Sequence, residues 1–185
     1  FISRKAMNID SLGEGKVELL YDKGLIKNVA DLYSLRADQL LGLEKAMTDE
    51  TTGKTRVVRL QEKSVENILK GIESSKSVPF EKVLFALGIR HVGETLAAKI
   101  ARHVESMDAL MNMKAEELVQ IGDVGIIIAE SIVSWSQSLT HMQLVERLKA
   151  AGLQFEVQQQ ALLSEKLKGF TFVISGVFSS PERRN

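Results

Sequence analysis

Apolar residues follow a helical spacing along most of the chain. Val17, Leu20 and Tyr21 fall on one face of a predicted helix, and the same spacing recurs between Val65 and Leu69. Only 2 of the 185 residues are proline, which leaves long stretches free to form uninterrupted helices. We therefore expect a mainly helical fold.

A second pattern is an apolar template that recurs around tight turns. Gly93 and Gly125 each follow isoleucine by four positions and valine by one. Each is followed by alanine four positions later and by isoleucine seven positions later. Aliphatic residues fill all four positions around Gly13 and Gln61 as well. The spacing of these turns, a period of roughly 32 residues, indicates repeated supersecondary units that share one core.

The units are also related in pairs. When the sequence is aligned with itself so that Asn28 pairs with Ser106, two typical helix N-cap residues are matched. The same shift pairs Leu32 with Leu110, Ala37 with Ala115, Asp38 with Glu116, Leu40 with Leu118 and Leu43 with Ile121. The hairpin of the second unit falls at either Met47 or Gln61. An insertion of about 14 residues accounts for this ambiguity, and it carries the polar segment 48–56, which is typical of an exposed loop.

Each unit is predicted to be a helix, a tight turn and a second helix. The apolar residues before the glycine attach the turn to the core. The glycine permits a positive φ and leaves no side chain between the backbone and a ligand. The next helix then begins with unpaired N–H groups and the positive end of its dipole, which together favour an anion. Against a duplex, such turns hold phosphates without reading bases. The alternative is that the glycines are ordinary helix C-caps.

Composition narrows the possible functions. The chain has no cysteine, which excludes disulfides, cysteine-ligated zinc or iron–sulfur sites and a thiol nucleophile. Lys+Arg and Asp+Glu are both 24, so the formal net charge is zero and the chain is not a strongly basic nucleic-acid binder. Backbone donors need no net charge, so the turns still predict DNA binding. A neutral helical scaffold for protein interactions stays an alternative. No apolar run reaches the length of a membrane span.

The candidate DNA-binding residues lie in these turns or directly after them. Their side chains would add phosphate contacts to those of the amides, and the alternative for the charged ones is a solvated surface. The candidates are Gly13, Gly15, Lys16, Lys63, Ser64, Arg90, His91, Gly93, Thr95, Lys99, Asp123 and Gly125. No catalytic or metal-binding residue is predicted.

The turns resemble the helix-hairpin-helix motif, whose hairpin reads apolar-x-Gly-apolar-Gly. Ser11, His91 and Asp123 stand where the motif has its first glycine, and residues of these types tolerate a positive φ. Three segments, 3–9 (SRKAMNI), 62–68 (EKSVENI) and 84–95 (LFALGIRHVGET), occur in the order in which bacterial NAD-dependent DNA ligases have similar ones. The segment 167–176 is similar to the opening strand of the BRCT domain of the same family.

This resemblance implies a domain organisation. Residues 1–156 would form a tandem helix-hairpin-helix DNA-binding domain of four units in two pairs, and 157–166 a linker. Residues 167–185 would begin a truncated α/β BRCT domain, represented by its first strand only.

The resemblance also implies a function. The parent enzyme would seal nicks in replication and repair, with NAD as adenylate donor, a divalent metal such as Mg and a zinc finger. The adenylation core would lie upstream, and no Lys-x-Asp-Gly string occurs here, so this fragment is expected to hold no cofactor and to be inactive alone. Its partners would be the minor-groove backbone of nicked double-stranded DNA and other domains of the ligase, with no membrane. The implied location is the bacterial cytoplasm, in association with the nucleoid. The alternative family is another DNA repair protein with helix-hairpin-helix units.

Overall fold

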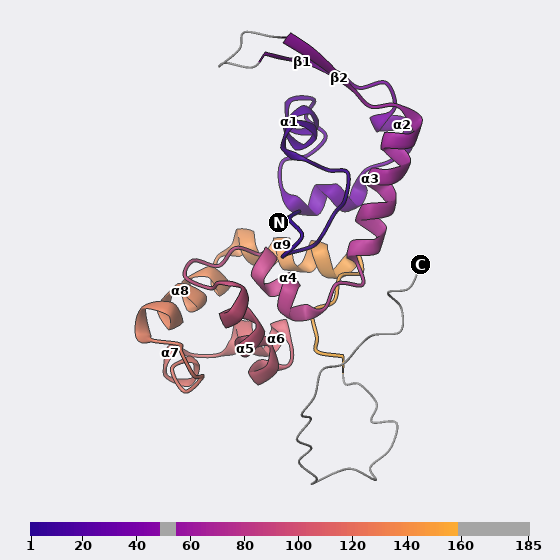
Figure 1. The fold of residues 1–185 in the computed structure, drawn as a ribbon. Helices are drawn as coiled ribbons and strands as arrows, with labels where there is room; N and C mark the ends of the chain where they lie inside the picture. Colours follow the sequence, from indigo (N-terminus) through magenta and orange to yellow (C-terminus); the bar gives the residue numbers. More distant parts are fainter. Residues whose placement is uncertain (49–54, 159–185) are drawn as a thin grey trace, which may run out of the picture.

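The computed structural model describes residues 1–48 and 55–158, and the elements below lie in these ranges. The prediction of a mainly helical fold is confirmed (Figure 1). In chain order the elements are α1 (Glu14–Asp22), the 3₁₀ helix η1 (Val29–Ser34), α2 (Ala37–Leu40), β1 (Glu44–Thr48), β2 (Thr55–Arg59), α3 (Glu62–Ser75), α4 (Phe80–Ala86), α5 (Glu94–Val104), α6 (Met107–Asn112), α7 (Ala115–Leu118), α8 (Ile126–Ser136) and α9 (Leu139–Ala150). None of these helices combines the length and the apolarity needed to cross a bilayer.

The predicted relation between two halves of the chain is confirmed. Asn28 caps η1 by accepting a hydrogen bond from the N–H of Ala30, and Ser106 caps α6 by accepting one from the N–H of Ala109. The short helices α2 and α7 begin at alanines that the same shift of the sequence aligns. Leu40 of α2 and its counterpart in α7 are both completely buried. The repeat is therefore a repeat of local structure and of core positions.

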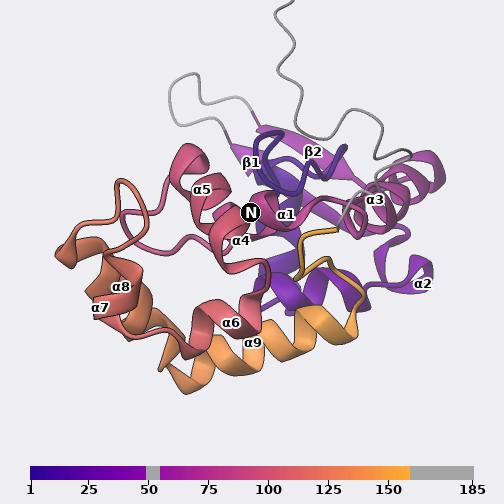
Figure 2. The ribbon, with the colours of Figure 1, turned by 90° about the horizontal axis from the view of Figure 1, so that it is seen from below.

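Helix α9 joins the two halves. Lys149 of α9, the orange helix of Figure 2, forms an ion pair with Asp108 of α6. The guanidinium of Arg147 in α9 donates to Asn28 Oδ1 at 3.2 Å and to Asp31 Oδ1 at 2.7 Å. Burial raises the pKa of Asp31, but hydrogen bonds from Arg147 and from two backbone N–H groups outweigh it, so the pKa is lowered overall. The carboxylate of Asp31 thus stabilises the contact between η1 and α9.

The insertion in the second unit is partly strand, which corrects the prediction of an exposed loop over 48–56. Strands β1 and β2 pair antiparallel, with Glu44 opposite Arg59 and Thr48 opposite Thr55. Residues 49–54 lie outside the described part. Lys45 binds the carboxylates of Glu18 and Asp22 in α1 and so holds the hairpin against the first unit. Strand pairing of this kind leaves no helical period in the sequence.

The first unit has no helix before its turn, contrary to the prediction for every unit. Residues 3–7 form successive turns, in which the N–H groups of Ala6 and Asn8 both donate to the carbonyl of Ser3. The prediction also places Tyr21 on the apolar face of α1. In the structure Tyr21 is 63% exposed, and Leu19 is buried instead. The expected BRCT strand at 167–176 and residues 159–166 of the expected linker lie outside the described residues.

Candidate nucleic-acid interface

The apolar residues around the three glycine turns attach them to the core as predicted. The residues four and one positions before each glycine are at most 5% exposed: Ile9, Leu12, Ile89, Val92, Ile121 and Val124. In the third and fourth units the second of these residues donates its N–H to the carbonyl of the first, at 3.0 Å in both turns. The position of each turn is therefore set by buried side chains on both sides of its bend.

The residue with positive φ in each turn is not the glycine that sequence reasoning proposed. Ser11, His91 and Asp123 have φ values of 65°, 67° and 69°, which confirms that these residues adopt the left-handed conformation. Gly13, Gly93 and Gly125 instead have φ values of −85°, −81° and −80° and an extended backbone. The bend is already complete two residues before the glycine. Each glycine is the N-cap of the next helix, so the C-cap alternative is wrong as well.

These N-cap glycines leave the helix starts open. A Cβ built on Gly13, Gly93 or Gly125 would meet no atom within 4 Å, and each glycine is exposed. Within residues 1–48 and 55–158, no N-cap side chain accepts from the first N–H groups of these three helices. The donors at the start of α1, α5 and α8 are thus free to bind an anion that approaches from solvent.

The charges at the three helix starts differ. Helices α1 and α5 have a glutamate in the first turn, and Glu94 of α5 is 3.4 Å from Lys5 Nζ. Helix α8 has no charged residue in its first turn. It begins with Ile126 and Ile127, which are 56% and 66% exposed. The fourth turn therefore offers bare amides beside an apolar surface. Sequence reasoning missed these isoleucines because it counts apolar residues at helical spacing as core; their direct succession after Gly125 was the available signal.

The third and fourth units share one hollow. Arg90 and His91 of the third turn line a depression of about 730 Å³ together with Ile127, Glu130 and Ser134 of α8. An ion pair between Lys99 of α5 and Asp123 also joins the two units. The third turn therefore faces α8, and α5 contacts the fourth turn through Asp123.

The other predicted side chains lie at the surface in various settings. Lys16 Nζ donates to the carbonyl of Ser11 at 2.7 Å and so lies across its own turn. Thr95 is exposed in the first turn of α5, and Gly15 is partly exposed in that of α1. Lys99 is predicted to contact a phosphate. In the structure its amine forms an ion pair with Asp123.

The second unit retains the helix start and loses the turn. Gln61 is the N-cap of α3 with φ −92°, so Lys63 and Ser64 occupy the first turn of that helix. Strand β2 ends at Arg59, two residues before Gln61, and no residue between Thr55 and Gln61 has a positive φ. The alternative hairpin position, Met47, is in β1. The second unit therefore does not present the compact bend of the others.

His141, which lines the hollow beside Arg90 and His91, has a structural partner. His141 Nδ1 lies 3.0 Å from the carbonyl of Trp135, and the two rings stack with centroids 4.5 Å apart. Over residues 1–48 and 55–158 no three His, Asp or Glu side chains are grouped as a metal site requires. The described part thus offers backbone donors and a few cations as its binding chemistry.

Comparison with known proteins agrees with this geometry. A family model described as "Helix-hairpin-helix motif" matches residues 82–145, which include the third and fourth turns. The chain is 50% identical over 186 residues to a DNA ligase of Cytophaga hutchinsonii, covering 99% of this chain and 26% of the relative. It is 45% identical to DNA ligases of Flavobacterium psychrophilum and Phocaeicola vulgatus, over 96% and 99% of this chain and 25% and 26% of theirs. The chain spans about a quarter of the length of these curated relatives.

Proposed function

Because the chain is homologous along nearly its whole length to a quarter of several DNA ligases, we propose that it is the DNA-binding region of a nick-sealing ligase. The likeness extends well beyond the hairpin motif itself, which favours a ligase over another repair protein with helix-hairpin-helix units. It also favours DNA binding over a protein-interaction scaffold.

The observation that carries this proposal is the exposure of three uncapped helix N-termini, each behind a bend with a left-handed residue. Such amides bind phosphate oxygens and make no contact with base edges, so binding is independent of sequence. The zero net charge of the chain is compatible with this mode because the donors are neutral amides. The shared hollow of the third and fourth units suits the two strands that border one groove. We assign this groove as the minor groove of nicked duplex.

The proposal extends to the parent enzyme. It would use NAD to adenylate a lysine outside this region. Other parts of the longer polypeptide would bind a divalent metal and form a zinc finger. The present chain would then bind DNA and would not seal a nick alone. Other domains of the ligase would also bind the duplex.

A fluorescence anisotropy titration tests the binding directly. The chain is titrated onto a labelled nicked duplex between 50 and 200 mM salt, with an intact duplex of the same length and a nicked duplex of different sequence as comparisons. We expect log affinity to fall linearly with log salt, with a slope of about −0.9 for each phosphate that a lysine or arginine of the chain neutralises. Changing the bases should leave the affinity unaltered. Absence of binding to every duplex at 50 mM salt would refute the proposal.

A further inference from the structure

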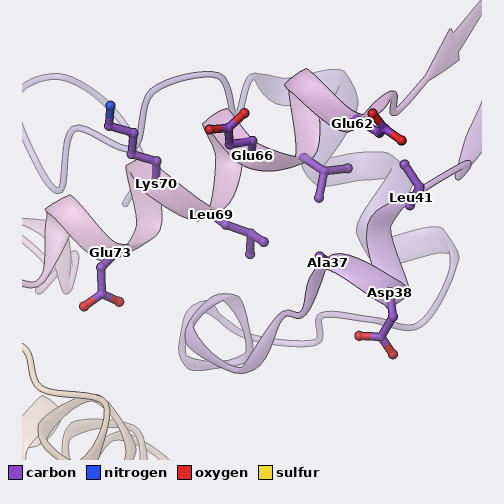
Figure 3. Close-up of a pocket in the computed structure, with 9 residues that line it drawn as sticks. Ala37, Asp38, Leu41, Glu62, Glu66, Leu69, Lys70 and Glu73 are labelled. Atoms are coloured by element: carbon purple, nitrogen blue, oxygen red, sulfur yellow. The ribbon is translucent and has the colours of Figure 1, made fainter.

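A groove lies between α2 and α3. We call it the α2–α3 groove, and its volume is about 700 Å³. Its lining residues are Ala37, Asp38, Leu41, Glu62, Val65, Glu66, Leu69, Lys70 and Glu73. Figure 3 shows the side chain of Leu69 extending from α3 toward α2, with carboxylates on both sides of the groove. In Figures 1 and 2, α2 lies at the opposite end of the molecule from α7 and α8.

The floor of the groove is apolar and open to solvent. Leu41 is 52% exposed, and Leu69 is half-buried. Val65 is buried beneath them. A floor of this kind is large enough to accept one aliphatic side chain of a partner, and covering it would remove apolar surface from water.

The rim of the groove is acidic. Four carboxylates and a single lysine surround the floor. Asp38 binds Arg36, and Glu73 binds Lys76 at 2.7 Å. Glu62 and Glu66 have no ion-pair partner among the residues that the structure describes. Glu62 and Glu66 therefore leave negative charge on the rim that no cation of the described residues pairs, which favours a cationic partner.

The internal repeat indicates that the acidic rim is not a by-product of the fold. Aligning Gln61 with Gly125 places Glu62, Glu66, Lys70 and Glu73 of α3 over Ile126, Glu130 and Ser134 of α8 and its C-cap Gln137. Only one of these α8 residues is acidic. The two units therefore share a backbone and core but differ in the chemistry of this face.

We propose that the α2–α3 groove binds a basic amphipathic helix of a separate protein. An aliphatic residue of that helix would enter between Leu41 and Leu69, and lysine or arginine residues one turn away would face Glu62 and Glu66. A groove between two helices matches the mode in which a single amphipathic helix docks through a few apolar anchors. A contact between whole domains instead covers a broad surface. The proposal goes beyond DNA binding and does not depend on it.

Two synthetic helical peptides test this proposal. Both have leucines at the same i, i+3, i+4 and i+7 positions, and their polar positions are all lysine in one and all glutamate in the other. Each is titrated into the isotope-labelled chain while amide chemical shifts are recorded. We expect the lysine peptide to shift the amides of α2 and α3, and the glutamate peptide to leave them unchanged. Shifts scattered over the molecule, or equal shifts with both peptides, would overturn the proposal.

Three variants test whether the peptide binds in the α2–α3 groove. The double variant Glu62→Gln/Glu66→Gln should weaken the lysine peptide about 3- to 10-fold, since each exposed ion pair contributes a fraction of a kcal/mol. Leu41→Ser should weaken it further, and Leu41 is exposed enough for the fold to persist. Glu130→Gln, the matched change in α8, should have no effect. Equal affinity for all variants would contradict the assigned site.

Two further measurements separate this proposal from others. Nicked-duplex affinity should be retained in the Glu62→Gln/Glu66→Gln variant, so failure of the groove and failure of DNA binding are distinguishable. The lysine peptide should also bind the full-length ligase that contains this chain. Loss of peptide binding in the longer protein would mean that its own polypeptide covers the groove, and would refute a separate partner.

Discussion

The central prediction concerns the N-cap glycines of the third and fourth turns. We expect the double variant Gly93→Val/Gly125→Val to remain folded and to lose most of its DNA affinity. Both residues have φ values near −80° and an extended backbone, which valine adopts readily. A Cβ at either position meets no protein atom within 4 Å. The new side chains would therefore occupy only the space in front of the helix amides, where a phosphate has to approach.

The magnitude follows from the hydrogen bonds that the valines would obstruct. A hydrogen bond to a charged group contributes about 1.5–3 kcal/mol, and exposure to solvent favours the lower end. Losing one such bond at each turn corresponds to about tenfold weaker binding, and to about 100-fold for the double variant.

The cost to stability is modest and can be controlled. Replacing a glycine N-cap by valine costs about 1 kcal/mol at each helix. Leu153→Ala is a suitable control, because this core leucine is 6% exposed and its truncation costs about 2–3 kcal/mol without touching a turn. Anisotropy with a nicked duplex gives the affinities, and urea denaturation gives the stabilities. Unaltered affinity in the folded double variant would refute the assignment of these turns.

Three further predictions follow from individual contacts. Asp123→Asn keeps a residue that tolerates the left-handed conformation, removes a carboxylate beside the fourth turn and releases Lys99, so nicked-duplex affinity should rise about 2- to 5-fold; weaker binding would contradict this. Asp31→Asn should lower the free energy of unfolding at pH 7 by about 1–2 kcal/mol, because it weakens the bond from Arg147. Since the folded-state pKa of Asp31 is lowered, its contribution is present above the ordinary aspartate pKa and is lost as pH falls through the folded value, so urea curves of the two proteins should converge below about pH 4. Gly71→Ala should destabilise the chain by about 1–3 kcal/mol in urea, although alanine favours helices, because the added Cβ lies 2.9 Å from the backbone of the first turn; a gain in stability would show that this contact relaxes freely.

The sequence by itself determined the features that depend on local pattern. Apolar residues at fixed distances from Gly93 and Gly125 are buried as expected, because a helical period fixes which residues face the core. The caps at Asn28 and Ser106 form because their bonds span only two or three residues. The left-handed conformation at Asp123 follows from residue type and its place in the motif.

Tertiary structure decided the features that depend on distant neighbours. The pairing of β1 with β2 joins residues that share no helical period. Lys99 is bound by Asp123, from another unit, rather than free for a phosphate. The α2–α3 groove arises where two separate helices meet. The reason is common to all three: sequence spacing specifies which residues share a face of one element, whereas packing between elements specifies what that face meets.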